Sequence, residues 1–93
     1  MTTIVDPKVG VTYRTILLRA ADEIRRNGHC KTRAFGPEGI CIMTALNWVP
    51  CDGSNFYDVL LAIRRVIGDE TLIDWNFRQD AKSVIQMLER AAL

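Results

Sequence analysis

Residues 39–51 read Gly-Ile-Cys-Ile-Met-Thr-Ala-Leu-Asn-Trp-Val-Pro-Cys, and this stretch decides how the rest of the chain folds. It holds no charged side chain, although charged residues make up 25% of the 93-residue chain. A segment this apolar in a small globular protein has to be buried, so amphipathic helices on both sides are expected to pack around it. The sequence favours a short helix from about Ile40 to Trp48, with a brief extended entry and an end at Pro50.

The segment before this stretch is compatible with either a short strand or an ordered loop. It runs over residues 29–35 and leads into Gly-Pro-Glu-Gly at 36–39, which is a strong turn signal. A minor β-hairpin within residues 30–42 is therefore an additional expectation, with Ile-Cys-Ile at 40–42 as its second arm.

The longest helix on the N-terminal side is predicted over residues 13–27. Thr12 is suited to be its N-cap, and Gly28 stands where a left-handed C-cap would lie. Apolar side chains recur at the helical spacing and define a buried stripe, formed by Tyr13, Leu17, Ala20 or Ala21, and Ile24.

Three helical segments are predicted on the C-terminal side. The first covers about Phe56 to Ile67, with Ser54 or Asn55 as its N-cap. The second is one or two turns within residues 71–76, and the third runs from Ala81 to about Ala92 after an Asp80 cap. Together with the helices above, these segments predict a mainly α, single-domain bundle of four to five helices.

The domain is expected to cover residues 12–93, and residues 1–11 are expected to form an extended lead-in because Pro7 and Gly10 discourage helix. No window holds the roughly 18 apolar residues that a membrane-spanning helix needs. The first residues also lack the basic start and long apolar run of a signal peptide. These features predict a cytoplasmic protein without membrane insertion.

Three cysteines, Cys30, Cys41 and Cys51, are an odd number for a disulfide framework and fit a reducing compartment better. Together with His29 they include suitable ligands for zinc, but no two are spaced as Cys-x-x-Cys. We expect packed, inert thiols, with Cys41 on the short central helix, and neither a metal site nor a cofactor. Thiol or metal chemistry at His29, Cys30 and Cys41 is the last-ranked interpretation.

The motifs of common enzyme classes are missing from this sequence. It contains no glycine-rich phosphate loop, no Gly-x-Ser-x-Gly and no His-Glu-x-x-His, and His29 is its one histidine. The carboxylates of Asp69, Glu70 and Asp74 are better interpreted as a solvated acidic edge than as a catalytic cluster. A non-enzymatic protein is therefore expected.

The charge is unevenly distributed along the chain. Residues 1–35 carry a balance of +4 and residues 36–93 a balance of −3, within a net charge of +1. A basic patch is expected at the end of the first helix, formed by Arg25, Arg26, Lys31 and Arg33. It predicts weak, salt-sensitive nucleic-acid binding as the alternative function, although basic residues also complement a helix C-terminus.

Large side chains near the ends of the predicted elements suggest protein binding instead. The hypothetical binding residues are Asp74, Trp75, Asn76 and Phe77. Phe77 lies between Asn76 and a charged run, so it is expected to be the most exposed. Aromatic side chains of this kind are the usual anchors of protein interfaces.

Several short motifs resemble one known family over roughly residues 16–92. They occur in the same order and at similar spacing, and they are Leu18-Arg19-Ala20-Ala21-Asp22-Glu23-Ile24, Asn27-Gly28, Cys41, Ala45-Leu46, Trp75-Asn76, Val84, Leu88 and Ala91-Ala92. The family comprises small actinobacterial and actinobacteriophage proteins defined only as a domain of unknown function.

The chain departs from the family pattern at three positions. His29 stands where an aromatic residue is frequent, Thr44 replaces a usual glycine, and Phe77 replaces a usual aspartate. The last change weakens any acidic function shared at that position. The resemblance implies no activity, but it implies an actinobacterial or phage origin. We therefore expect a small protein-interaction module, such as a phage accessory protein that binds and modulates a host protein.

Overall fold

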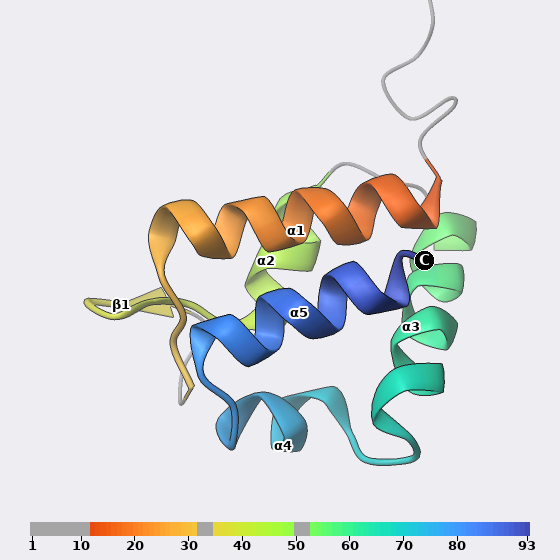
Figure 1. Cartoon of the computed structure of the whole chain (residues 1–93). Helices are drawn as coiled ribbons and strands as arrows, with labels where there is room; N and C mark the ends of the chain where they lie inside the picture. The colour runs from red at the N-terminus through yellow and green to blue at the C-terminus, as the bar shows by residue number, and fades with distance from the viewer. Residues whose placement is uncertain (1–11, 32–34, 50–52) are drawn as a thin grey trace, which may run out of the picture.

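The computed structural model describes residues 12–31, 35–49 and 53–93. Five helices and one two-stranded antiparallel hairpin make up these residues (Figure 1). In chain order the elements are α1 (Tyr13–Asn27), β1 (Phe35–Gly36), β2 (Gly39–Ile40), α2 (Ile42–Trp48), α3 (Gly53–Ile67), α4 (Leu72–Phe77) and α5 (Ala81–Ala91). The predicted mainly α domain with a minor hairpin is thus confirmed. The predicted lead-in over residues 1–11 lies outside the described part.

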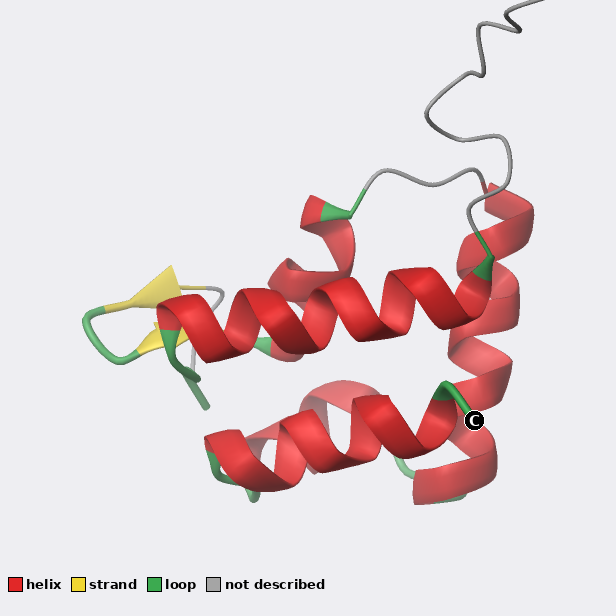
Figure 2. Cartoon of the chain, turned by 45° about the horizontal axis from the view of Figure 1, so that its top comes forward, coloured by secondary structure: helices red, strands yellow, loops and turns green. Residues whose placement is uncertain are grey.

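Helices α1 and α5 lie antiparallel and side by side, and they form the centre of the bundle (Figures 1 and 2). Helix α3 crosses one end of this pair, next to the start of α1 and the end of α5. Helix α2 packs on α1 and on α4. The hairpin and α4 therefore lie at the end of the pair where α1 finishes and α5 begins.

The predicted apolar stripe of α1 lies in the core at Leu17, Ala20, Ala21 and Ile24, whereas Tyr13 is only partly buried against it. Ile16 of α1 also belongs to the core. The other helices contribute Ile42, Ala45 and Leu46 from α2, Val59, Ala62 and Ile63 from α3, and Val84, Met87, Leu88 and Ala91 from α5. The expected burial of the central apolar stretch holds for Ile40, Ile42, Ala45, Leu46 and Val49. It is wrong for Trp48, which is 51% exposed at the end of α2, because a helix turns only one face to the core.

The N-cap predictions hold for two helices. The Thr12 hydroxyl accepts a hydrogen bond from the Thr15 N–H at 3.4 Å, and the Asp80 carboxylate accepts one from the Ser83 N–H at 2.8 Å. The predicted start of α3 at Phe56 is wrong, because the helix begins almost one turn earlier, at Gly53. The first turn of α3 is formed by Gly-Ser-Asn at 53–55. Such small polar residues are tolerated there because the N–H groups of a first turn have no acceptor within the helix.

The extended entry to α2 is held by backbone pairing on two sides. Ile40 pairs with Phe35 across the hairpin and forms a parallel bridge with His29. In this bridge the Ile40 N–H donates to the Gly28 carbonyl at 3.1 Å, and the Cys30 N–H donates to the Ile40 carbonyl at 2.9 Å. Ile40 is therefore a strand residue, and the helix starts at Ile42 instead of near Ile40.

This bridge requires glycine on both sides. Gly28 has φ +85° and Gly39 has φ +138°, conformations that residues with a side chain rarely adopt. A Cβ on Gly39 would overlap with the backbone of Gly28, and a Cβ on Gly28 would overlap with the Glu38 carbonyl oxygen. Gly28 is the C-cap of α1 at positive φ, as predicted, and its N–H donates to the Ile24 carbonyl at 2.8 Å. Its ψ of 179° differs from the αL value, so the chain leaves the cap extended and enters the bridge.

Within the described segments, none of the helices is long and apolar enough to cross a membrane.

Candidate protein-binding surface

Helix α4 is a short element fixed at both ends. At its start the Thr71 hydroxyl accepts a hydrogen bond from the Asp74 N–H at 3.3 Å. An ion pair between Glu70 and Arg78 joins the residues that flank the helix. The chain leaves α4 at Phe77 and begins α5 at Ala81, after three intervening residues that end with the Asp80 cap. These contacts stabilise the helix itself, whereas its place in the fold depends on contacts to other segments.

Asn76 anchors α4 from the inside. Its side chain is buried, and its Oδ1 accepts hydrogen bonds from the Ile42 N–H at 3.1 Å and from His29 Nε2 at 2.7 Å. Its Nδ2 donates to the carbonyls of Cys30 at 3.2 Å and Lys31 at 3.3 Å. All four hydrogen-bonding positions of the amide are used.

The same contacts assign the His29 tautomer. The Ile42 N–H is a donor only and the two carbonyls are acceptors only, so the Asn76 amide has one consistent orientation. Oδ1 then faces His29, and Nε2 carries the proton. His29 is thus a buried donor to an amide oxygen.

The Asn76 network connects segments that are distant in the sequence. It joins the chain after α1, the first residue of α2 and the last turn of α4. The Ile42 N–H is one of the first-turn groups that α2 cannot satisfy internally. Cys41 caps that turn as well, because its Sγ accepts from the Thr44 N–H at 3.4 Å. Cys41 therefore precedes the helix as its N-cap, and the prediction that it lies on the helix is wrong.

The outer face of α4 is apolar and exposed. The side chains of Ile73 and Phe77 lie one turn apart and are 69% and 58% exposed. Asp74 lies beside them on the same exposed side. We call Ile73, Asp74 and Phe77 the outer face of α4.

The structure divides the four predicted binding residues between two environments. Asp74 and Phe77 lie on the outer face, and the expected exposure of Phe77 is found. Trp75 is half-buried against the core, whereas Asn76 is buried and cannot touch a partner. Asn76 is therefore a structural residue. Ile73 was missed, although its i,i+4 spacing to Phe77 is visible in the sequence.

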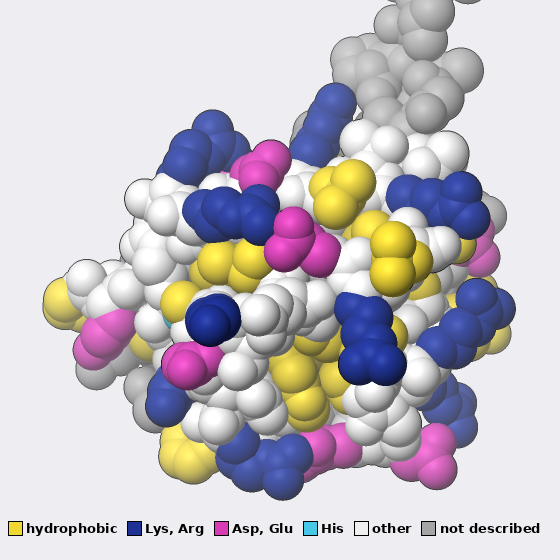
Figure 3. Space-filling model, viewed as in Figure 1, with side chains coloured by type: hydrophobic (Ala, Val, Ile, Leu, Met, Phe, Trp, Pro, Cys, Tyr) yellow, Lys and Arg dark blue, Asp and Glu magenta, His cyan; other side chains and the backbone are white. Residues whose placement is uncertain are grey.

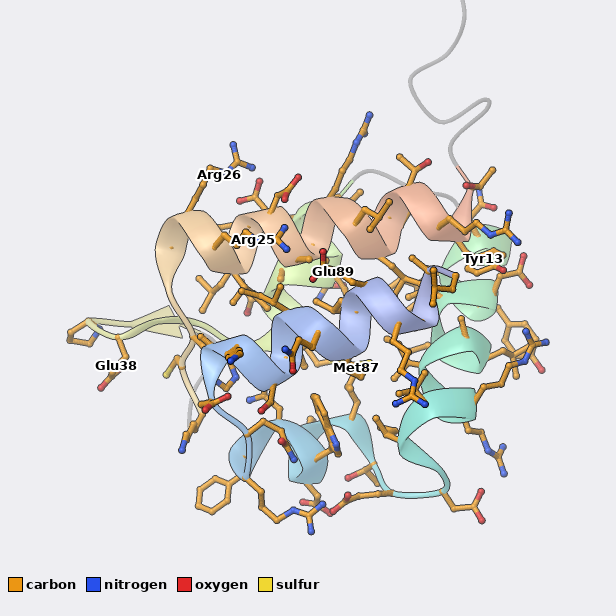
Figure 4. All side chains as sticks on the ribbon, in the orientation of Figure 1. Tyr13, Arg25, Arg26, Glu38, Met87 and Glu89 are labelled. Carbon is orange, nitrogen blue, oxygen red and sulfur yellow. The ribbon has the colours of Figure 1, made fainter. Side chains whose placement is uncertain are left out.

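The predicted basic patch is largely paired with carboxylates. Arg25 binds Asp22 at 2.7 Å and reaches Glu89 of α5 at 2.8 Å, and Arg26 pairs with Glu23 (Figure 4). Hydrogen bonds to Glu89 and Asp22 raise the pKa of Arg25 further above its ordinary range. Of the two other residues, Lys31 is exposed and Arg33 lies outside the described residues.

The cysteines are not gathered with His29 into a metal site in the part of the chain that the structure describes. No three side chains of histidine, cysteine, aspartate or glutamate come together there as metal ligands. Cys30 is buried and Cys41 is half-buried as a cap, and both are free thiols. Cys51 lies outside the described residues.

No curated protein and no solved structure matches the chain significantly. The model of a family of unknown function, DUF6197, matches residues 9–93, which include every described element. The chain therefore belongs to the DUF6197 family, whose function is unknown.

Proposed function

We propose that this protein is a small, non-enzymatic interaction module that binds a partner protein through the outer face of α4. The observation that carries the proposal is the exposure of Ile73 and Phe77, at 69% and 58%, on a helix anchored from inside by Asn76. Exposed large apolar groups on a fixed element are what a protein interface uses as anchors.

The energetics favour such a role. Full burial of one isoleucine or phenylalanine side chain is worth roughly 1.5–3 kcal/mol. Binding usually loses part of that gain to the ordering of the interface. Here the N-cap of Thr71 and the Glu70–Arg78 ion pair support the helix itself, and the Asn76 network holds it against the rest of the fold. Little ordering cost is therefore left for the complex.

The charges around the outer face point to the chemistry of the partner. Asp69 is paired with Arg64 at 2.8 Å, and Glu70 is paired with Arg78. Asp74, beside the two apolar side chains, takes part in no ion pair with the described residues. The partner we propose presents an apolar pocket with lysine or arginine at its rim, because opposite charges steer and orient association.

The resemblance to actinobacteriophage proteins supports a finer proposal about the partner. Small phage proteins commonly bind and redirect a host protein, so the proposed partner is a cytoplasmic protein of the actinobacterial host. Nucleic-acid binding through the basic patch is not favoured, because Arg25 and Arg26 already have carboxylate partners.

Site-specific photo-crosslinking tests this proposal. A benzophenone amino acid replaces Phe77, and the full-length protein is irradiated in a nuclease-treated actinobacterial lysate. The matched control carries the same group at Tyr57, which is 63% exposed on α3. We expect a protein adduct from position 77 that is missing from position 57.

Competition decides whether that adduct is specific. Excess wild-type protein should abolish the adduct, whereas excess of the double variant Ile73→Asp/Phe77→Asp should leave it. The proposal is overturned if position 77 gives no adduct, if both positions give the same adduct, or if the double variant competes as well as the wild type. An adduct that forms only without nuclease would also overturn it.

A further inference from the structure

A second surface lies on the other side of α4. It is a groove of about 220 Å³ between the end of α3, helix α4 and helix α5. Its lining is apolar and polar in similar measure. Val66, Ile67, Trp75 and Met87 are apolar, and Ser83, Gln86 and Arg90 contribute polar groups. Figure 4 shows Met87 on the side of α5 that faces α4, and Figure 3 shows hydrophobic surface exposed in this region.

The groove is separate from the outer face of α4. In an α-helix each residue turns by about 100°, so Trp75 lies about 160–200° around α4 from Ile73 and Phe77. Trp75 lines the groove, whereas Ile73 and Phe77 do not. One helix therefore separates two surfaces that different parts of a partner, or different partners, can reach.

The volume of the groove limits what it can hold. Small-molecule sites usually have about 300–1,000 Å³, whereas a cavity of about 150 Å³ is sufficient for benzene. A groove of about 220 Å³ thus fits one large apolar side chain, such as phenylalanine or leucine. Trp75 and Met87 in the lining suit such a side chain, because aromatic rings and thioethers pack well against apolar groups.

The positive charge of Arg90 at the groove determines which peptide segments can carry such a side chain. Arg90 lies in the last turn of α5, and Gln86 lies one turn before it on the same side. The Arg90 guanidinium takes part in no ion pair with any described residue. A guanidinium has only donors, and it binds a carboxylate more strongly than it binds a neutral acceptor.

We propose that this groove binds an acidic peptide segment of a protein partner. One large apolar side chain of the segment lies in the groove against Trp75 and Met87, and a neighbouring carboxylate binds Arg90. Charge complementarity selects this occupant over a basic or purely apolar segment. The inference shares the idea of a protein partner with the proposed function, but it uses different residues.

Titration by NMR tests the inference with defined peptides. The probe is the blocked peptide acetyl-Asp-Phe-Glu-amide, added to isotope-labelled full-length protein. Its two controls are acetyl-Lys-Phe-Lys-amide and acetyl-Asp-Ala-Glu-amide. We expect the acidic phenylalanine peptide to shift the Trp75 indole and Met87 methyl signals and to bind about tenfold or more tightly than either control.

Variants of the protein make the result specific. Arg90→Glu should weaken the acidic peptide about tenfold or more, whereas Arg65→Glu, an exposed position on α3 outside the groove, should leave binding unchanged. Ile73→Asp/Phe77→Asp should also leave binding of the acidic peptide unchanged. The test of the groove can therefore fail or succeed independently of the test of partner binding at the outer face of α4. The inference is overturned if the Trp75 and Met87 signals do not move, if the three peptides bind alike, or if Arg90→Glu binds as well as the wild type.

Discussion

The Nε2 of His29 lies 2.7 Å from the Oδ1 of Asn76, and both side chains are buried. This contact closes a network in which one asparagine satisfies two donors and two acceptors from the chain around α1 and α2. A buried polar group without a partner costs free energy, so the network is stable only when it is complete. It explains how a six-residue helix keeps a fixed place in the fold.

Replacement of Asn76 should destabilise the fold strongly. Asn76→Ala leaves the Ile42 N–H and the Cys30 carbonyl buried, and the Lys31 carbonyl partly buried, without this partner. We expect a loss of about 3 kcal/mol in the free energy of unfolding, measured by urea denaturation. Gln79→Ala, at a half-buried neighbouring position, is the control and should change stability by less than about 1 kcal/mol. Equal effects of the two substitutions would contradict this role of Asn76.

The bond between His29 and Asn76 should appear as a coupling energy. His29→Phe keeps an aromatic ring but removes the Nε2 donor. A double-mutant cycle with Asn76→Ala should give a coupling of about 1 kcal/mol, because each substitution removes the same bond. The cycle is measured by urea denaturation of the two single variants and the double variant. Strictly additive effects would show that the two residues act independently.

Two glycines with positive φ, one inside the bridge and one outside it, allow the steric effect of a Cβ to be tested. Gly39→Ala should cost at least about 3 kcal/mol of stability, because its Cβ would overlap with the Gly28 backbone in a strained conformation. Gly68 also has a positive φ, of +83°, but a Cβ there would meet nothing within 4 Å. Gly68→Ala should therefore cost only about 1–2 kcal/mol. Thermal unfolding of both variants tests this, and a similar loss for the two would rule out the steric explanation.

Acid should weaken the N-cap of α5. Hydrogen bonds from the Ser83 backbone and side chain hold the pKa of Asp80 below its ordinary value of 3.8. The unfolded state therefore binds more protons than the folded state in this range, so stability rises with pH there. The contribution of Asp80 is present above about pH 4 and is lost as the pH falls through the folded pKa.

The variant Asp80→Asn isolates this effect, since asparagine caps a helix well but does not titrate. Unfolding measured from pH 6 down to pH 2.5 should show a steeper loss for the wild type than for the variant below about pH 4. Parallel curves for the two proteins would exclude a contribution from the Asp80 titration.

The sequence is sufficient to predict features that depend on neighbouring residues. The bounds of α1 and the caps at Thr12 and Asp80 follow from local capping and helical spacing, and the structure has them as predicted. The extended conformation at Ile40 is instead set by hydrogen bonds to residues 28–30, which are distant in the sequence. Local preferences therefore could not predict where α2 starts.

The role of Asn76 could not be predicted for the same reason. Its partners His29 and Ile42 lie 47 and 34 positions away in the chain. The pair Trp75-Asn76 suggested a surface motif, whereas tertiary hydrogen bonds turn the asparagine inward. Ile73 is different, because its spacing to Phe77 is local and predicts a shared helical face.

The outer face of α4 should affect binding without affecting stability. Ile73→Asp/Phe77→Asp replaces exposed side chains, so the free energy of unfolding should change by no more than about 1 kcal/mol in urea. A larger loss would show that these side chains support the fold, which would contradict their assignment to a binding surface.

The central claim is that a partner protein binds the outer face of α4. The most direct measurement is the Kd between the purified partner that crosslinks from position 77 and three forms of this protein, by isothermal titration calorimetry. Ile73→Asp/Phe77→Asp should weaken binding about 100-fold or more, because two buried anchors are lost, and Tyr57→Asp should change it by less than about threefold. A double variant that binds as tightly as the wild type, or an equal loss with Tyr57→Asp, would contradict the claim.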